Sequence, residues 1–199
     1  MENPVPAQES GSEMNAVQES SFNNSDDAKA FYEVAKARLL NVNKWDEVAK
    51  LPSSTFILCD SSGQRISRNV QLGDYLKIDI PGPGTSTGDG YDWVKVEFIE
   101  EQHENGAEIM SFRVRPTDNP LSKEIATAHF FDDAATSTFQ VKKIGNIVTA
   151  EVHGRNERPN THTDHVMDNI RNTMVGIGAK VGASYPQWKG LVAGIAATD

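Results

Sequence analysis

The stretch Tyr75-Leu76-Lys77-Ile78-Asp79-Ile80 decides the fold, because side chains of two kinds alternate along it without interruption. Its even-numbered residues are all aliphatic, whereas its odd-numbered residues carry a hydroxyl or a charge. Successive side chains of a β-strand point to opposite faces of a sheet, so this pattern predicts a strand with one buried face. The same alternation recurs over residues 93–99 and 109–115. The middle of the chain is therefore expected to form a sheet.

Short runs of Gly, Pro, Ser and Asn separate the strand-like segments on either side of this stretch. Parallel neighbours need crossovers of about a dozen residues, whereas Ser61-Ser62-Gly63-Gln64 and Gly145-Asn146 suit hairpin turns. We therefore predict a mostly antiparallel sheet. Its expected strands cover residues 55–59, 66–71, 75–80, 93–99, 109–115, 138–144 and 147–153.

Both ends of the chain show helical spacing instead. Ser25, Asp26 and Asp27 form a good helix start, because a hydroxyl accepts from a free backbone N–H and carboxylates suit the positive end of the helix dipole. A second short helix is expected around Trp45. Near the C-terminus, one helix is predicted over residues 164–181. Another is predicted after the capping box of Ser184 and Gln187, with an apolar stripe made of Trp188, Leu191, Val192 and Ile195.

Together these elements predict an α+β domain, in which a curved sheet of about seven strands is flanked by N-terminal and C-terminal helices. This order loosely resembles the helix-grip ligand-binding domains, where a sheet wraps a long C-terminal helix around a cavity. One difference is that no strand is predicted before the first helix. Residues 1–25 contain four Glu, no Lys or Arg, and a single aromatic side chain, so they are expected to be a disordered acidic and polar tail. Residues 26–199 would then form the single domain.

Composition excludes some classes of partner. The chain has 199 residues and a net charge of −9, which disfavours nucleic acid because phosphate binding depends on clustered Lys and Arg. Cys59 is the only cysteine and cannot form an intramolecular disulfide, so a reducing cytoplasm is the simplest expectation for localisation. No apolar run approaches the roughly 18 residues of a membrane span, and no secretory leader is recognisable. A soluble protein is therefore expected.

An apolar ligand pocket is one candidate site, between the sheet and the C-terminal helices. Its expected lining is Trp93, Phe112, Phe139, Met174 and Trp188. Such a pocket favours a non-enzymatic binding module, whose partner would be a small apolar or acidic ligand or another protein.

A basic site is the second candidate. Arg113 and Arg115 share one face of their strand, and His153 and Arg155 share one face of theirs. If the two faces meet, four donors could bind an acidic group, since guanidinium matches a carboxylate or a phosphate. The alternative is that these side chains pair with the Glu residues between positions 97 and 108.

The alternative function is that of a small enzyme, either hydrolase-like or metal-dependent. It would use His153, Arg155 and Glu157, or the cluster of His162, Asp164, His165 and Asp168. The cluster does not match a zinc motif, and its aspartates also suit a helix cap, so no metal is expected. The Gly- and Pro-rich loop at 81–90 lacks the Lys of a phosphate-binding loop, and no nucleophile motif is present. No cofactor and no catalytic residue are therefore assigned.

Overall fold

The computed structural model describes residues 3–49, 54–79, 88–122, 126–160 and 185–198. Its first half contains strand β1 (Ser12–Ser21), helix α1 (Ser25–Leu40), the 3₁₀ turn η1 (Val42–Lys44) and helix α2 (Trp45–Ala49). Strands β2 (Thr55–Cys59), β3 (Tyr75–Asp79), β4 (Asp92–Glu104), β5 (Ala107–Pro116), β6 (Thr136–Ile144) and β7 (Ile147–Glu157) follow. Residues 185–195 form the C-terminal helix.

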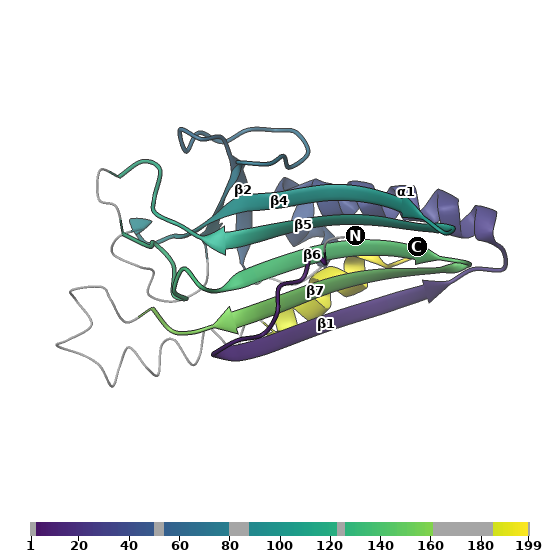
Figure 1. Cartoon of the computed structure of the whole chain (residues 1–199). Coiled ribbons are helices and arrows are strands. Elements are labelled where there is room, and N and C mark those ends of the chain that lie inside the picture. Colours follow the sequence, from purple (N-terminus) through teal and green to yellow (C-terminus); the bar gives the residue numbers. More distant parts are fainter. Residues whose placement is uncertain (1–2, 50–53, 80–87, 123–125, 161–184, 199) are drawn as a thin grey trace.

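All seven strands form one antiparallel sheet in the order β1-β7-β6-β5-β4-β3-β2. Figure 1 shows this sheet curving around α1 and the C-terminal helix, which both lie on the same side of it. The α+β class and the helix-grip arrangement expected from the sequence are therefore confirmed. We call the face of the sheet that packs against these helices the inner face, and the opposite one the outer face.

Residues 1–25 are not a disordered tail, since β1 is formed by part of this segment. It pairs antiparallel with β7, and the Ala16 side chain, opposite Val152, is only 2% exposed. The Ser20 hydroxyl also donates to the Ala196 carbonyl at 2.6 Å. An edge strand buries little side-chain surface, so its composition can be polar. Backbone hydrogen bonds to β7 stabilise this strand, and the side-chain pattern does not indicate them. The strand missing from the predicted helix-grip order is thus present, and the domain boundary at residue 25 is wrong.

Six of the predicted strands are observed, several of them longer than expected, but residues 66–71 do not form one. This segment is held by irregular contacts instead. The Val70 N–H donates to the Leu40 carbonyl at 3.0 Å, and the Arg68 guanidinium binds the Asp74 carboxylate through contacts of 2.6 and 2.8 Å. The apolar residues of this stretch therefore cover the core individually rather than as a strand face.

The N-cap of helix α1 lies one residue earlier in the chain than predicted. Asn24, not Ser25, is the N-cap, and its side-chain oxygen accepts from the Asp27 N–H at 2.8 Å. The short helix expected around Trp45 is observed as α2. The predicted helix at 164–181 and the residue Ser184 lie outside the described residues.

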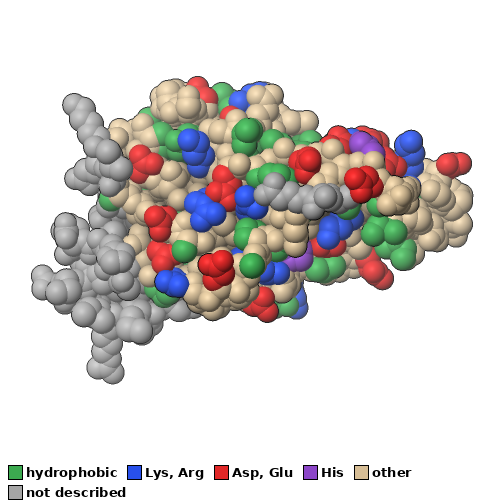
Figure 2. Space-filling model, viewed as in Figure 1, with side chains coloured by type: hydrophobic (Ala, Val, Ile, Leu, Met, Phe, Trp, Pro, Cys, Tyr) green, Lys and Arg blue, Asp and Glu red, His purple; other side chains and the backbone are tan. Residues whose placement is uncertain are grey.

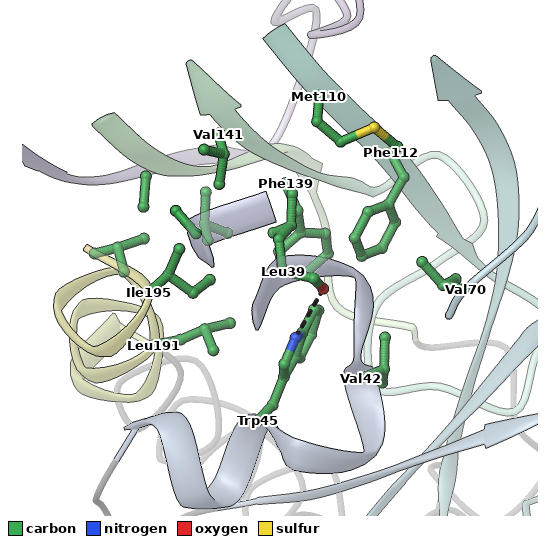
Figure 3. Close-up of a cluster of buried hydrophobic side chains, with 14 of the residues drawn as sticks. Leu39, Val42, Trp45, Val70, Met110, Phe112, Phe139, Val141, Leu191 and Ile195 are labelled. Atoms are coloured by element: carbon green, nitrogen blue, oxygen red, sulfur yellow. Dashed lines mark hydrogen bonds between the residues drawn. The ribbon is translucent and has the colours of Figure 1, made fainter. Parts of the chain in front are cut away.

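The core lies between the inner face of the sheet and the helices (Figure 3). Trp45 occupies its middle, where its ring lies 4.9 Å from the ring of Phe139 and 5.2 Å from that of Phe56. The indole N–H donates to the Leu39 carbonyl at 3.0 Å, so the polar atom of this side chain is satisfied. Helix α1 and the C-terminal helix pack over the sheet through this core.

Candidate functional site

A small cavity of about 50 Å³ lies on the inner face, beside the C-terminal helix. Most of its walls are apolar, as strand residues of even number in β3 and β4 and the aromatic rings of several elements converge on it. Its described lining is Phe56, Leu76, Ile78, Val94, Val114, His129, Phe130, Phe131, Ser137, Phe139, Glu157, Gln187 and Trp188. The sequence-predicted pocket between sheet and C-terminal helix therefore has a counterpart in the structure, with Phe139 and Trp188 in its wall.

Two polar side chains in this wall are buried with few hydrogen-bond partners among the described residues, and the Glu157 carboxylate accepts one long bond, from the Ser12 hydroxyl at 3.5 Å. Gln187 is 7% exposed, and its amide oxygen accepts from the Ser54 hydroxyl at 2.8 Å, while its amide nitrogen finds no partner among the residues that the structure describes. Glu157 is 8% exposed, and burial raises the pKa of its carboxyl from 4.5 to about 6. The apolar cavity thus presents one unused amide group and one carboxyl that is costly to ionise.

The raised pKa of Glu157 predicts a specific dependence of stability on pH. Between about pH 4.5 and 6 the folded state retains a proton that the unfolded state has lost, so stability falls as pH rises through this window. We expect Glu157→Gln to be more stable than the wild type by up to about 2 kcal/mol at pH 7.5, and to lose this advantage at pH 4. Denaturant titrations at both pH values measure the difference. An equal advantage at pH 4 and 7.5 would show that the carboxyl is not perturbed.

The outer face carries the predicted basic residues. Alternation along β4 places Glu97 on this face, next to the bulge between Val96 and Phe98, and its carboxylate accepts from Arg113 Nε at 2.5 Å and from Arg115 Nε at 2.6 Å. Burial alone would raise the pKa of Glu97, but the hydrogen bonds from Arg115 and Arg113 hold it below its ordinary value. The predicted pairing with a nearby Glu is therefore observed for these two arginines.

The other two basic residues lie on the same face, and strand pairing brings them into line with the first two. Arg113 is opposite Thr138, which is opposite His153, so one row crosses β5, β6 and β7. His153 is held by Asn15 at 2.7 Å and by Glu151 at 2.8 Å. Arg155 donates to backbone carbonyls, and among the described residues it forms no ion pair. Figure 2 shows Lys or Arg and Asp or Glu side chains intermingled on this face.

Trp93 does not line the inner cavity, which corrects the sequence-based assignment. It is 1% exposed in a separate cluster with Cys59 and Ala128, and its neighbours Val94 and Val96 belong to the main core. Alternation along β4 places Trp93 on the outer side. Within the described ranges, its indole nitrogen has no hydrogen-bond partner. Of the other two residues assigned to this pocket, Phe112 packs against Trp45 and Phe139 in the core and is not in the cavity wall, and Met174 lies outside the described residues.

The first proposed catalytic group does not assemble. Strict alternation would place His153, Arg155 and Glu157 on one face, but Asn156 adopts a positive φ of 56°. This turn of the backbone places Glu157 in the inner cavity, while His153 remains on the outer face. The second group, His162 with Asp164, His165 and Asp168, lies outside the described residues, as does most of the 81–90 loop.

Sequence reasoning missed two features of these sites. Gln187 was assigned only to a capping box, although a glutamine on the cavity side of an amphipathic helix was a visible signal. Residues 3–10 were assigned to the tail, yet they cross the outer face, where the Pro4 carbonyl accepts from Arg113 Nη1 at 2.8 Å. Nothing in their composition indicates this contact.

No protein-family model and no curated protein matches the chain. Several solved structures show similarity. A hypothetical protein of Helicobacter pylori aligns with 12% identity and a TM-score of 0.45, over 90% of this chain and 86% of its own. The major latex-like protein 151 of Panax ginseng aligns with 12% identity and a TM-score of 0.36, over 88% of this chain and 99% of its own. The truncated norcoclaurine synthase of Thalictrum flavum aligns with 12% identity and a TM-score of 0.33, over 92% of this chain and 96% of its own. In the described part of the chain, no helix has the length and apolar character to cross a membrane.

Proposed function

We propose that this protein is a non-enzymatic binding module, whose inner cavity receives one end of a small, largely apolar ligand. The observation that carries this proposal is the convergence of Glu157 and Gln187 on a cavity with mainly apolar walls. Pockets that combine apolar walls with a few polar groups are typical of small-molecule sites. A cavity of about 50 Å³ has room only for a small group, so the rest of the ligand would extend away from it.

The polar groups specify which end of the ligand enters. An ionised Glu157 only accepts hydrogen bonds, and an ammonium group would also offset the cost of its buried charge. A ligand with a hydrogen-bond donor at its end, above all an amine, is therefore favoured, and one that ends in a carboxylate is disfavoured by like-charge repulsion. The small apolar ligand is thereby narrowed to an apolar amine or alcohol.

Calorimetric titration with octylamine and octanoate at pH 7.5 tests this proposal, because the two probes share an apolar chain and differ at the polar end. We expect octylamine to bind at least about tenfold more tightly than octanoate, equivalent to about 1.4 kcal/mol. In the Glu157→Gln variant, the ratio of octylamine affinity to octanoate affinity should be smaller. The uncharged 1-octanol should bind with similar affinity to the variant and to the wild type. Absence of saturable octylamine binding, or equal affinity for octanoate, would contradict the proposal.

A further inference from the structure

A second hollow, of about 490 Å³, lies on the outer face, on the opposite side of the sheet from the inner cavity. Its volume falls within the range of about 300–1,000 Å³ that is common for small-molecule sites. Strands β4, β5, β6 and β7 form its floor, and the N-terminal residues form a wall. Its lining includes Pro4, Gln140, Lys142, Glu151, His153 and Arg155.

The wall consists of the N-terminal strap, which we define as residues 3–10. The Pro4 carbonyl accepts from Arg113 Nη1 at 2.8 Å and from the Thr138 hydroxyl at 3.3 Å. At its other end Asn156 brackets the strap, since its side-chain oxygen accepts from the N–H groups of Glu9 and Ser10 at 2.8 and 3.1 Å. Figure 1 shows the strap crossing the front of the sheet from the start of β1. The hollow is therefore bounded by backbone fixed at two points.

Gln140 in the floor has an unused hydrogen-bonding group. Its side chain is 2% exposed, and its amide nitrogen donates to the Ser111 hydroxyl at 2.8 Å, whereas its amide oxygen has no partner in the described part of the chain. Flipping the amide would let the oxygen accept from Ser111 and would leave the nitrogen unpaired instead. In either orientation one polar atom of Gln140 lacks a partner, which is costly at a buried position. A ligand hydroxyl satisfies both orientations, because it donates and accepts.

The charges around the hollow favour a single negative charge on the ligand. Lys142 and Arg155 are cationic, and Lys142 lies 2.8 Å from the Glu151 carboxylate. Burial would raise the pKa of Glu151, but hydrogen bonds from His153 and Lys142 lower it to about 2, so this group stays ionised. Among the described residues, no carboxylate lies within ion-pair distance of Arg155, which is thus the cation of this hollow that is left for a ligand. A dianion such as phosphate would be repelled more strongly than a monoanion by the negative charge of Glu151.

From this arrangement we propose that the outer hollow binds a small hydroxy-carboxylic acid, with its carboxylate on Arg155 and a hydroxyl on Gln140. Guanidinium binds carboxylate through a planar pair of N–H groups, and Arg155 is the arginine of this face that Glu97 does not engage. The site is distinct from the inner cavity, because the two lie on opposite faces and call for ligands of opposite charge, although the positive charge of Arg155 acts across the strand to lower the pKa of Glu157.

Titration calorimetry at pH 7.5 and low salt tests this site with gluconate, which carries both a carboxylate and hydroxyl groups. Hexanoate has the same number of carbons and the carboxylate but no hydroxyl groups, and xylitol has hydroxyl groups but no charge. We expect gluconate to bind in a saturable 1:1 manner and the other two at least about tenfold more weakly, because xylitol loses the charge-assisted pair with Arg155 and hexanoate leaves the buried polar atom of Gln140 without a partner. Failure of gluconate to saturate, or equal binding of hexanoate, would overturn the proposal.

Matched variants locate the binding. Arg155→Gln should weaken gluconate about tenfold or more, and Arg155→Lys, which keeps the charge but loses the planar fork, should weaken it less. Arg65→Gln removes one positive charge from an exposed position elsewhere and should leave binding unchanged. Gln140→Met keeps the size of the side chain and should also weaken gluconate. Far-UV circular dichroism verifies the fold of each variant, and unchanged gluconate affinity in the folded Arg155→Gln and Gln140→Met proteins would overturn the site.

Discussion

Replacing Trp45 by alanine is expected to destabilise the protein by about 3–5 kcal/mol, the usual cost of truncating a buried tryptophan. The indole is 1% exposed and contacts aromatic rings from β2, β5 and β6, so its loss would open a cavity at the point where α2 meets the sheet. It also leaves the Leu39 carbonyl without its 3.0 Å donor. Chemical denaturation followed by far-UV circular dichroism gives the change in free energy of unfolding.

Trp45→Phe is the matched control, because it retains an aromatic ring but removes the indole N–H. We expect it to cost clearly less than the alanine variant, with the lost hydrogen bond contributing about 1 kcal/mol. If Trp45→Ala unfolded within about 1 kcal/mol of the wild type, the indole could not be at the centre of the core.

Ala16→Asp in β1 is expected to cost at least about 3 kcal/mol, because it would place a carboxylate without a partner on the inner face. Gln18→Asp introduces the same group two residues along the same strand and face, but at an exposed position, and should change stability by about 0.5 kcal/mol or less. Thermal and denaturant unfolding of the two variants measure this contrast. Equal, small effects would mean that residues 12–21 are the disordered tail that their composition suggests.

The strands with a buried face were predictable because burial of one face imposes a period of two on the sequence. Strands β3 to β7 each carry this pattern, and β2 carries a short apolar run. The face of Trp93 was also readable, since it is adjacent to Val94 and must point the other way. Its assignment to the inner pocket was therefore an avoidable error. In contrast, residues 66–71 have strand-like composition but are held by Arg68 and Asp74 in an irregular segment.

The candidate sites were only partly predictable. The sequence indicated an apolar pocket against the C-terminal helix and a polar face that carries Arg113 and His153. It could not indicate that Asn156 reverses the alternation and sends Glu157 to the inner cavity, because a positive φ at a single Asn depends on its contacts with residues 7–10. The outer hollow depends on the strap and on strand register across β5, β6 and β7, which joins residues far apart in the chain.

The α+β class, the antiparallel character of the sheet and the positions of most elements could be predicted from the sequence, because they follow from side-chain periodicity and short connections within a few residues. Tertiary structure alone decided that residues 12–21 complete the sheet as its edge strand. It also decided which polar side chains lack partners in each cavity. An edge strand is stabilised mainly by backbone hydrogen bonds to β7, which any sequence can form and no side-chain pattern reveals. The partners of a buried polar group are likewise set by long-range packing.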